Sequence, residues 1–287
     1  MGGLAPGGLG PVVITGSMGI SALIVGSLVD PVAGLVPLFG ISCIMISIFF
    51  ANFWRDPDRF IPKEKGIIVS PADGHVMFVQ RERATGRRPS KQQQESGTII
   101  SDPLTGDWFE QPLDEPLTFE TEQRYSPVPV GAEQDGDVWR IAVFMSPLDV
   151  HVNRSPVEGD LIIMEYRKGK GKKRGPFLPA YKKESEFNER IRSVFATKEG
   201  LRIEVVQISG ALARTIVPWV SPPVSLRRGE RFGMIRLGSR VDIRVPAHLF
   251  TPNVISARDN HPHHPKGQFV QAGSSILFLP HRVGETE

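Results

Sequence analysis

Residues 231–245 read RFGMIRLGSRVDIRV, two apolar runs joined by the dipeptide Gly238-Ser239. The second run alternates strictly between apolar and charged residues, which are Val241, Ile243 and Val245 against Arg240, Asp242 and Arg244. A period of two is typical of a β-strand, because successive side chains point to opposite faces of the sheet. The pattern therefore predicts a strand over residues 240–245 with one buried face and one face exposed to water.

Short apolar runs of the same kind, separated by turn residues, fill much of the chain after residue 65, and helical periodicity is rare there. Lys198-Glu199-Gly200 separates two of these runs and predicts a hairpin. We therefore expect a mostly β body. Besides residues 240–245, the expected strands cover residues 66–69, 75–80, 138–145, 160–166, 191–197, 201–208 and 231–237.

The N-terminal part has a different composition. The chain has 287 residues, with 34 Lys and Arg against 31 Asp and Glu, yet residues 1–54 contain only one charged side chain, Asp30. This contrast excludes a wholly soluble protein and a disordered chain. A disulfide-stapled secreted module is also excluded, because Cys43 is the only cysteine and lies in the apolar part.

Two uncharged stretches, residues 11–29 and 31–54, are each long enough to cross a bilayer as a helix. Asp30-Pro31 lies between them and favours a turn, so we expect one or two membrane helices, with a helical hairpin as the best fit. A cleaved signal peptide would need a basic N-terminal region, and no Lys or Arg precedes Arg55. Residues 1–54 are therefore the expected membrane anchor.

The flank after the anchor carries Arg55, Arg59, Lys63 and Lys65. By the positive-inside rule this flank stays in the cytoplasm. We therefore expect the charged body, residues 55–287, to lie on the cytoplasmic side of the cell (inner) membrane.

Two segments of the body look irregular. Residues 81–137 are rich in Pro, Asp and Glu and predict a surface insertion that is largely unstructured. Residues 167–174 contain six basic residues and no acidic one. They could be a solvated loop or a segment attracted to anionic lipid headgroups.

Three stretches could carry chemistry because each puts a reactive side chain in or beside a predicted turn. They are residues 70–74 (SPADG) with Asp73, residues 145–156 (MSPLDVHVNRSP) with His151, and residues 237–240 (LGSR) with Ser239. Together they supply a carboxylate, an imidazole and a hydroxyl, the set in which an imidazole can take a hydroxyl proton. The Gly-x-Ser-x-Gly elbow of many hydrolases is missing around Ser239.

The sequence resembles the phosphatidylserine decarboxylases, membrane-bound enzymes that use a pyruvoyl group, and within them the short bacterial and archaeal-like class. The likeness runs in family order through residues 53–59, 70–74, 144–156, 184–190, 207–216 (QISGALARTI) and 233–242 (GMIRLGSRVD), with a looser match at residues 267–273. Arg240 stands where longer members have a small hydroxyl residue, which looks like the short class. The insertion and the basic stretch are larger than expected for that class.

The resemblance implies that the precursor breaks its own chain between Gly238 and Ser239. In such proteins the serine hydroxyl attacks the preceding carbonyl and the resulting ester eliminates, which leaves a pyruvoyl group at the new N-terminus. Gly238 fits this role because a strained turn favours a residue without Cβ. His151 is then the expected base and Asp73 the carboxylate that holds it. The products are a β-chain of residues 1–238 and an α-chain of residues 239–287, which form an α/β heterodimer.

The resemblance also implies the mature reaction. The amine of phosphatidylserine forms a Schiff base with the pyruvoyl ketone, and the adjacent amide carbonyl accepts the electrons as CO2 leaves. The product is phosphatidylethanolamine, so the protein is expected to act in phospholipid biosynthesis. No metal or added cofactor is expected.

Two other kinds of function remain open from the residues alone. Residues 153–168 and 267–277 look like halves of a lipoyl-type or biotinyl-type barrel sandwich, but neither presents a Met-Lys or Asp-Lys pair at a hairpin tip. We interpret them as the barrel-sandwich-like framework of the decarboxylase site. A membrane serine hydrolase would use the same Asp, His and Ser without cutting its own chain. The histidines of residues 261–265 (HPHHP) are expected to form a loop and not a metal site, because two prolines interrupt them.

Overall fold

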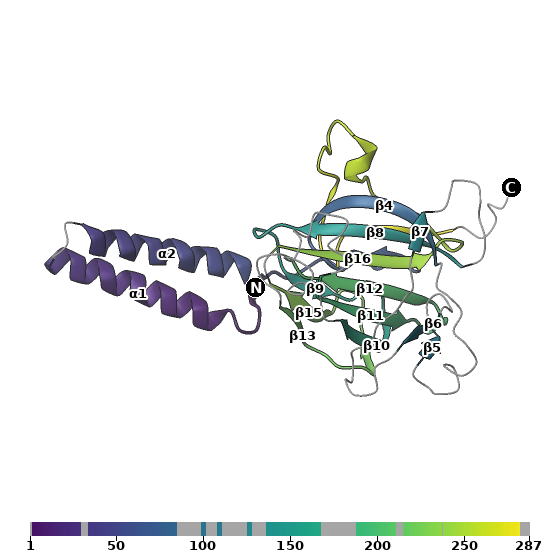
Figure 1. The fold of residues 1–287 in the computed structure, drawn as a ribbon, viewed down its shortest axis with the longest axis horizontal. Helices are drawn as coiled ribbons and strands as arrows, with labels where there is room; N and C mark the ends of the chain where they lie inside the picture. Colours follow the sequence, from purple (N-terminus) through teal and green to yellow (C-terminus); the bar gives the residue numbers. More distant parts are fainter. Residues whose placement is uncertain are drawn as a thin grey trace. The chain divides into compact units, whose positions relative to one another are not determined.

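The structure of the chain is a computed structural model. It describes residues 2–29, 34–84, 99–101, 108–110, 125–127, 136–167, 188–210, 215–236 and 238–281. These residues form two compact units (Figure 1), one made of residues 1–58 and 147–151 and the other of residues 59–146 and 152–287.

The first unit is built on two antiparallel helices, α1 (Leu9–Leu28) and α2 (Leu35–Phe53). Gly19 and Gly40 let the helix backbones approach closely, because a Cβ on either glycine would lie 2.9 Å from the carbonyl oxygen of the other. Both helices are long and apolar enough to cross a membrane, and most of their apolar side chains are exposed. The two helices confirm the predicted pair, and each end lies within four residues of its predicted position.

A short ladder completes this unit around the end of α2. Strand β1 (Gly3–Leu4) pairs with β2 (Arg55–Asp56), which follows α2 directly. Residues 147–151 also contact the end of α2, because the side chains of Asn52 and Arg55 both donate hydrogen bonds to the carbonyl of Leu148. The segment that ends at His151 is thus attached to the last turn of α2.

The second unit is mostly β, as predicted. Among its described strands the largest sheet has nine members, in the order β14-β10-β11-β12-β16-β8-β4-β18, with β7 paired to β4 (Figure 1). Every pair in this sheet is antiparallel, and the described strands do not close into a barrel. The strands are β4 (Gly74–Ala84), β7 (Tyr125–Pro127), β8 (Asp137–Met145), β10 (Gly159–Arg167), β11 (Arg190–Ala196), β12 (Arg202–Ile208), β14 (Val224–Leu226), β16 (Ser239–Pro246) and β18 (Phe269–Val270).

Smaller antiparallel sheets complete the body. They are β13 (Ile216–Pro218) with β15 (Arg231–Ile235) and β9 (Val152–Arg154), β17 (Phe250–Pro252) with β19 (Ile276–Pro280) and β3 (Ile68–Val69), and β5 (Ile99–Ser101) with β6 (Trp108–Glu110). The hairpin predicted around residues 198–200 is confirmed by the pairing of β11 with β12. One core, which includes Val143, Met145, Phe232 and Val241, packs between the sheets.

The prediction that one face of residues 240–245 is exposed to water is wrong. Arg240 is 0% exposed, Asp242 1% and Arg244 9%, while Val241, Ile243 and Val245 on the other face are also buried. The alternation of the strand is correct, but both of its faces are covered. The charged face is compatible with burial because its charges are paired with one another.

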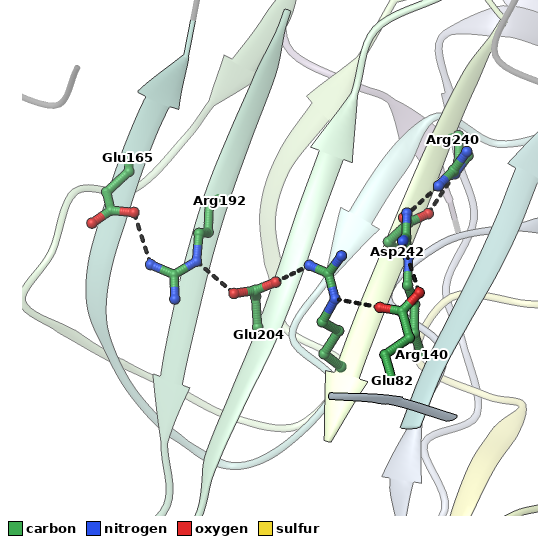
Figure 2. Close-up of polar contacts among 8 residues, drawn as sticks. Glu82, Arg140, Glu165, Arg192, Glu204, Arg240 and Asp242 are labelled. Carbon is green, nitrogen blue, oxygen red and sulfur yellow. Dashed lines mark hydrogen bonds and ion pairs between the residues drawn. The ribbon is translucent and has the colours of Figure 1, made fainter. Parts of the chain in front are cut away.

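The pairing extends across the sheet as an ion-pair ladder of four arginines and four carboxylates (Figure 2). Arg192 contacts Glu165 at 2.8 Å and Glu204 at 2.5 Å. Arg244 contacts both Glu204 and Glu82. Glu82 contacts Arg140 at 3.1 Å, and Asp242 binds both Arg140 and Arg240. The ladder is electrically neutral overall and crosses six strands: β10, β11, β12, β16, β4 and β8.

The predicted insertion at residues 81–137 starts too early. Strand β4 continues through Ala84, because Arg81 and Arg83 both pair with Asp137 on β8 and Glu82 joins the ion-pair ladder. The insertion proper therefore begins after β4. Residues 85–135 are described only in β5, β6 and β7, so the prediction that they are largely unstructured mostly lies outside the described residues. The basic stretch after Arg167 lies outside them entirely.

Candidate active site

The predicted cleavage dipeptide lies at the start of β16. Gly238 has a φ of +63°, in the left-handed region that favours glycine, and a Cβ added there would meet no atom within 4 Å. The conformation, and not lack of space, therefore calls for glycine. Ser239 is fully buried and pairs with Met145 on β8.

A small polar network surrounds Ser239. Its hydroxyl donates to the sulfur of Met145 at 3.4 Å, and the Asn153 side-chain amide lies 3.9 Å from the same sulfur. Gln207 donates to the Asn153 oxygen at 2.8 Å, and Asn153 donates to the carbonyl of Pro71 at 3.4 Å. This chain of contacts connects Ser239 with the turn that carries Asp73.

Asp73 is buried directly before β4 and is held by two donors. Arg59 Nη2 lies 2.6 Å from its Oδ2, and the backbone N–H of Ala272 lies 2.8 Å from its Oδ1. Gly74 follows with a φ of +148°, and a Cβ there would lie 2.1 Å from the carbonyl oxygen of Phe144. Glycine thus lets β4 begin against β8 immediately after the carboxylate.

His151 belongs to the unit of α1 and α2. Its Nδ1 donates to the carbonyl of Asp149 at 2.9 Å, and its ring lies 4.3 Å from the ring of Phe53, measured between centroids. Because a carbonyl only accepts, the proton of the neutral ring is on Nδ1 and the lone pair is on Nε2. Nε2 is buried and has no hydrogen-bond partner within the described ranges.

The environment of His151 also sets its protonation state. The pKa of this imidazole is lowered to about 4. Burial is the main cause and the charge of Arg55 acts in the same direction, while the interactions with Asp149 partly oppose them. The ring is therefore neutral at pH 7 and has an unprotonated nitrogen.

The structure accordingly brings Ser239 and the Asp73 turn into one network. His151 lies in the other unit, and its action on Ser239 and its support by Asp73 stay predictions. Sequence reasoning gave no role to Arg59, Met145, Asn153, Gln207 or Ala272. All five lie inside the stretches that resemble the family, but a stretch does not reveal which side chains meet.

Within the described part of the chain, no group of three or more His, Cys, Asp and Glu side chains is arranged to hold a metal ion. The ring of His261 does lie near two other histidines: its centroid is 5.7 Å from that of His263 and 5.3 Å from that of His264.

Comparisons with known proteins identify the family of the chain. The sequence profile of the phosphatidylserine decarboxylase family matches residues 46–278. Several similar proteins are named phosphatidylserine decarboxylase proenzyme. The one from Symbiobacterium thermophilum is 36% identical over 203 residues, which are 70% of each chain. The one from Erythrobacter litoralis is 36% identical over 234 residues, which are 81% of this chain and 72% of the relative.

A third relative with the same name, from Streptomyces griseus, is 50% identical over 107 residues, which are 37% of this chain and 46% of its own. No solved structure matches the chain. The family profile covers well over half of the sequence, and two relatives match it over most of their length at more than 30% identity. The chain therefore belongs to the phosphatidylserine decarboxylase family and is a decarboxylase.

Proposed function

We propose that the chain is a precursor that cuts itself between Gly238 and Ser239 and then decarboxylates phosphatidylserine to phosphatidylethanolamine. The observation that carries this proposal is the left-handed Gly238 directly before a buried serine, at the start of a strand. A free serine in an ordinary turn would need neither feature. The name proenzyme, given to the relatives, supports a processing step.

The cleavage can be written with its atoms balanced. Ser239 Oγ attacks the Gly238 carbonyl carbon, the peptide C–N bond breaks and an ester replaces it, while the nitrogen of Ser239 becomes an amine. Loss of the Ser239 α-proton then breaks the Cβ–Oγ bond and leaves a carboxylate on Gly238. The remaining dehydroalanine takes up one water and releases ammonia, which turns residue 239 into a pyruvoyl group. The products are a β-chain of residues 1–238 and an α-chain of residues 239–287.

His151 is the proposed base of this step. A neutral imidazole with a free lone pair is what proton removal from a hydroxyl requires, and Nε2 of His151 has this lone pair. Asp73 is the proposed electrostatic partner of the imidazolium that forms, and Arg59 and the Ala272 N–H hold its carboxylate in place.

The residues around Ser239 also fit a pyruvoyl group. Residue 239 is buried, and Met145 offers a weak sulfur acceptor in place of a strong one. When formed, the group supplies a ketone that takes the substrate amine and accepts electrons as CO2 leaves. His151 would return a proton to the substrate α-carbon.

The proposed location is the cytoplasmic face of the cell (inner) membrane. Helices α1 and α2 are uncharged throughout, and Arg55, Arg59, Lys63 and Lys65 follow them. A two-chained lipid substrate stays in the bilayer, so an anchored enzyme meets it without extracting it. In this location the reaction would supply phosphatidylethanolamine for phospholipid biosynthesis.

Denaturing gels and mass spectrometry of the purified full-length protein test the proposal. Two chains divided after Gly238, with an α-chain that lacks an amino terminus, are expected. Ser239→Ala should stay in one piece and be inactive, while His151→Ala and Asp73→Ala should cleave slowly or not at all. A wild-type chain that remains intact yet turns over phosphatidylserine would overturn the self-cleavage, and would point instead to chemistry on an unmodified serine.

A further inference from the structure

We infer that a cavity between β4, β8 and the segment of residues 257–266 binds the phosphodiester group of phosphatidylserine. This inference rests on the proposed function, because it assigns a part of the same substrate. The cavity has a volume of about 500 Å³ and is lined by His75, Met77, Phe78, Phe144, Arg258 and Lys266, among others. That volume is in the range of pockets that hold small molecules, about 300–1,000 Å³.

The charge of the cavity favours an anion. Arg258 and Lys266 are cationic, and none of the residues that line the cavity is acidic. Within the described ranges neither Arg258 nor Lys266 has a carboxylate partner. Cations without a carboxylate partner next to a concave surface are suited to a phosphate group.

Arg258 differs from the other arginines around Phe78 in having no described carboxylate partner. Three guanidinium groups lie over it, those of Arg140 and Arg240 at 5.3 Å and that of Arg258 at 4.7 Å from the ring centroid. Arg140 and Arg240 are neutralised by Asp242 within the ion-pair ladder. Arg258 alone of the three brings a charge to this ring that no described carboxylate balances.

The walls next to these cations are apolar. Met77, Phe78, Phe144 and Ala257 supply them, and they would accompany the glycerol and the first carbons of the acyl chains. An inorganic anion gains nothing from contact with apolar walls. An amphiphilic phosphodiester uses both the cations and the apolar surface, so the lining favours a lipid over free phosphate.

The cavity also lies next to the predicted reaction centre. Phe144 and Ser146, which line it, flank Met145, whose sulfur accepts the hydrogen bond of Ser239. His75 pairs with Phe144 and comes two residues after Asp73, and Arg240, which follows Ser239, also pairs with Phe144. Residues that pair directly across antiparallel strands have Cα atoms about 4.5–5.5 Å apart, so the backbone next to the cavity is one residue from Ser239. Side chains alternate between faces, so Phe144 and Arg240 point to the ladder face of the sheet and Ser239 and Met145 to the other, and the substrate would reach the cavity around the strand ends.

The chemistry of the substrate requires this closeness. In phosphatidylserine only two carbons and one oxygen separate the amine nitrogen from phosphorus. An amine that reacts at residue 239 therefore brings the phosphate next to the strand ends that carry Ser239 and Met145. Ser146, one residue past the end of β8, is among the residues that line the cavity.

Arg258→Gln, Lys266→Gln and the double variant test the assignment in the full-length protein, with phosphatidylserine in neutral detergent micelles. Self-cleavage needs no substrate, so all three variants should cleave as fully as the wild type. KM for phosphatidylserine should rise about tenfold for each loss, because each variant removes a charge-assisted hydrogen bond to the phosphate. The kcat should change little, because the reacting groups are untouched.

Lys198→Gln is the matched control, because Lys198 is an exposed cation in the β11–β12 turn, away from the cavity. An equal rise of KM in this control would mean attraction to the lipid surface in general and would overturn the inference. An unchanged KM in the fully cleaved double variant would overturn it too. If inorganic phosphate binds the wild type but not the double variant while KM stays unchanged, the cavity is a free-phosphate site and the inference is wrong. A wild type that does not cleave contradicts the proposed function instead, so the two failures are distinguishable.

Discussion

Gly238 is the residue at which backbone geometry and proposed chemistry coincide. Its φ of +63° costs a residue with a Cβ about 1–2 kcal/mol, although there is open space around it. Gly238→Ala should therefore strain the turn and displace the carbonyl that Ser239 attacks. We expect self-cleavage to slow by about tenfold, which corresponds to roughly 1.4 kcal/mol, as measured by the loss of precursor on gels over time.

Gly200→Ala is the control for that substitution. Gly200 also has a positive φ, +83°, and a Cβ there would also meet nothing within 4 Å. It lies in the β11–β12 turn, so the substitution should lower the free energy of unfolding by a similar amount and leave the rate of cleavage unchanged. Equal slowing in both variants would assign the effect to global stability and not to the cleavage turn.

Arg59 is a positioning residue for Asp73. Their contact of 2.6 Å is buried on both sides, so Arg59→Met would leave a carboxylate in the interior without its cation. The Asp73 carboxylate then loses the contact that holds it in place, and its predicted support of the imidazolium is weakened. We expect cleavage about ten to a hundred times slower, because a hydrogen bond to a charged group contributes about 1.5–3 kcal/mol.

The conservative variant separates this role from a purely structural one. Arg59→Lys keeps the charge but loses the planar fork, so it should recover part of the rate. If Arg59→Met cleaves at the wild-type rate at every pH, Arg59 does not support Asp73.

At the scale of elements, much of the β body could be predicted because its strands show their period in the sequence. The β11–β12 hairpin and strands such as β8 and β16 appear within one or two residues of their predicted ends. The buried charged face of β16 could not be predicted, because alternation separates two faces but does not tell what covers each of them. The charged face can be buried because side chains from strands far away in sequence pair with it, among them Glu82 of β4 and Glu204 of β12.

The sequence was enough to predict which residues belong to the candidate site, but not which side chains contact one another. Asp73, His151 and Ser239 lie in or beside turns that can be recognised from short sequence motifs. Gln207 meets Asn153 across 54 residues of chain, and Asp73 meets Ala272 across 199. Such pairs arise from the register of whole strands, which no local pattern contains.

The end of α2 connects the membrane anchor with the proposed base. The Phe53 ring packs against His151, and burial is the main reason that the pKa of this imidazole lies at about 4. The rate of self-cleavage should therefore stay high as the pH falls through 6 and reach half its maximum near pH 4, where Nε2 becomes protonated. A base with the ordinary pKa of about 6.5 would lose half its activity well before that.

Phe53→Ala tests this connection. Loss of the ring admits water, so the pKa of His151 should rise toward its ordinary value and the acidic limb of the cleavage profile should move to higher pH. Phe49→Ala is a suitable control, since Phe49 is one turn earlier on α2 and makes its ring contacts with Phe50 and Phe53. Circular dichroism at each pH shows whether both variants remain folded. A profile of Phe53→Ala that coincides with that of the wild type would remove α2 from the environment of the base.

At the scale of the whole molecule, the ion-pair ladder ties six strands of the main sheet together through side chains (Figure 2). Burial raises the pKa of Glu204 and Asp242, but the neighbouring arginines outweigh it, and both carboxyls have a pKa below the ordinary value. Their ordinary values are about 4, so the unfolded chain binds more protons than the folded one below that pH. Stability is therefore fully present above about pH 4 and is lost as the pH falls through the folded values.

Glu204→Gln should lower the free energy of unfolding at pH 7 by about 3–5 kcal/mol, because Arg192 and Arg244 would both lose a buried partner. The variant should also depend less on pH below 4, since one of the titrating carboxyls is gone. Glu199→Gln removes the same charge from the exposed turn of the β11–β12 hairpin and should leave stability nearly unchanged. Urea unfolding from pH 3 to 7 measures both effects. If the two variants match, or if Glu204→Gln loses stability with acid as steeply as the wild type, the ladder does not carry the acid sensitivity of the fold.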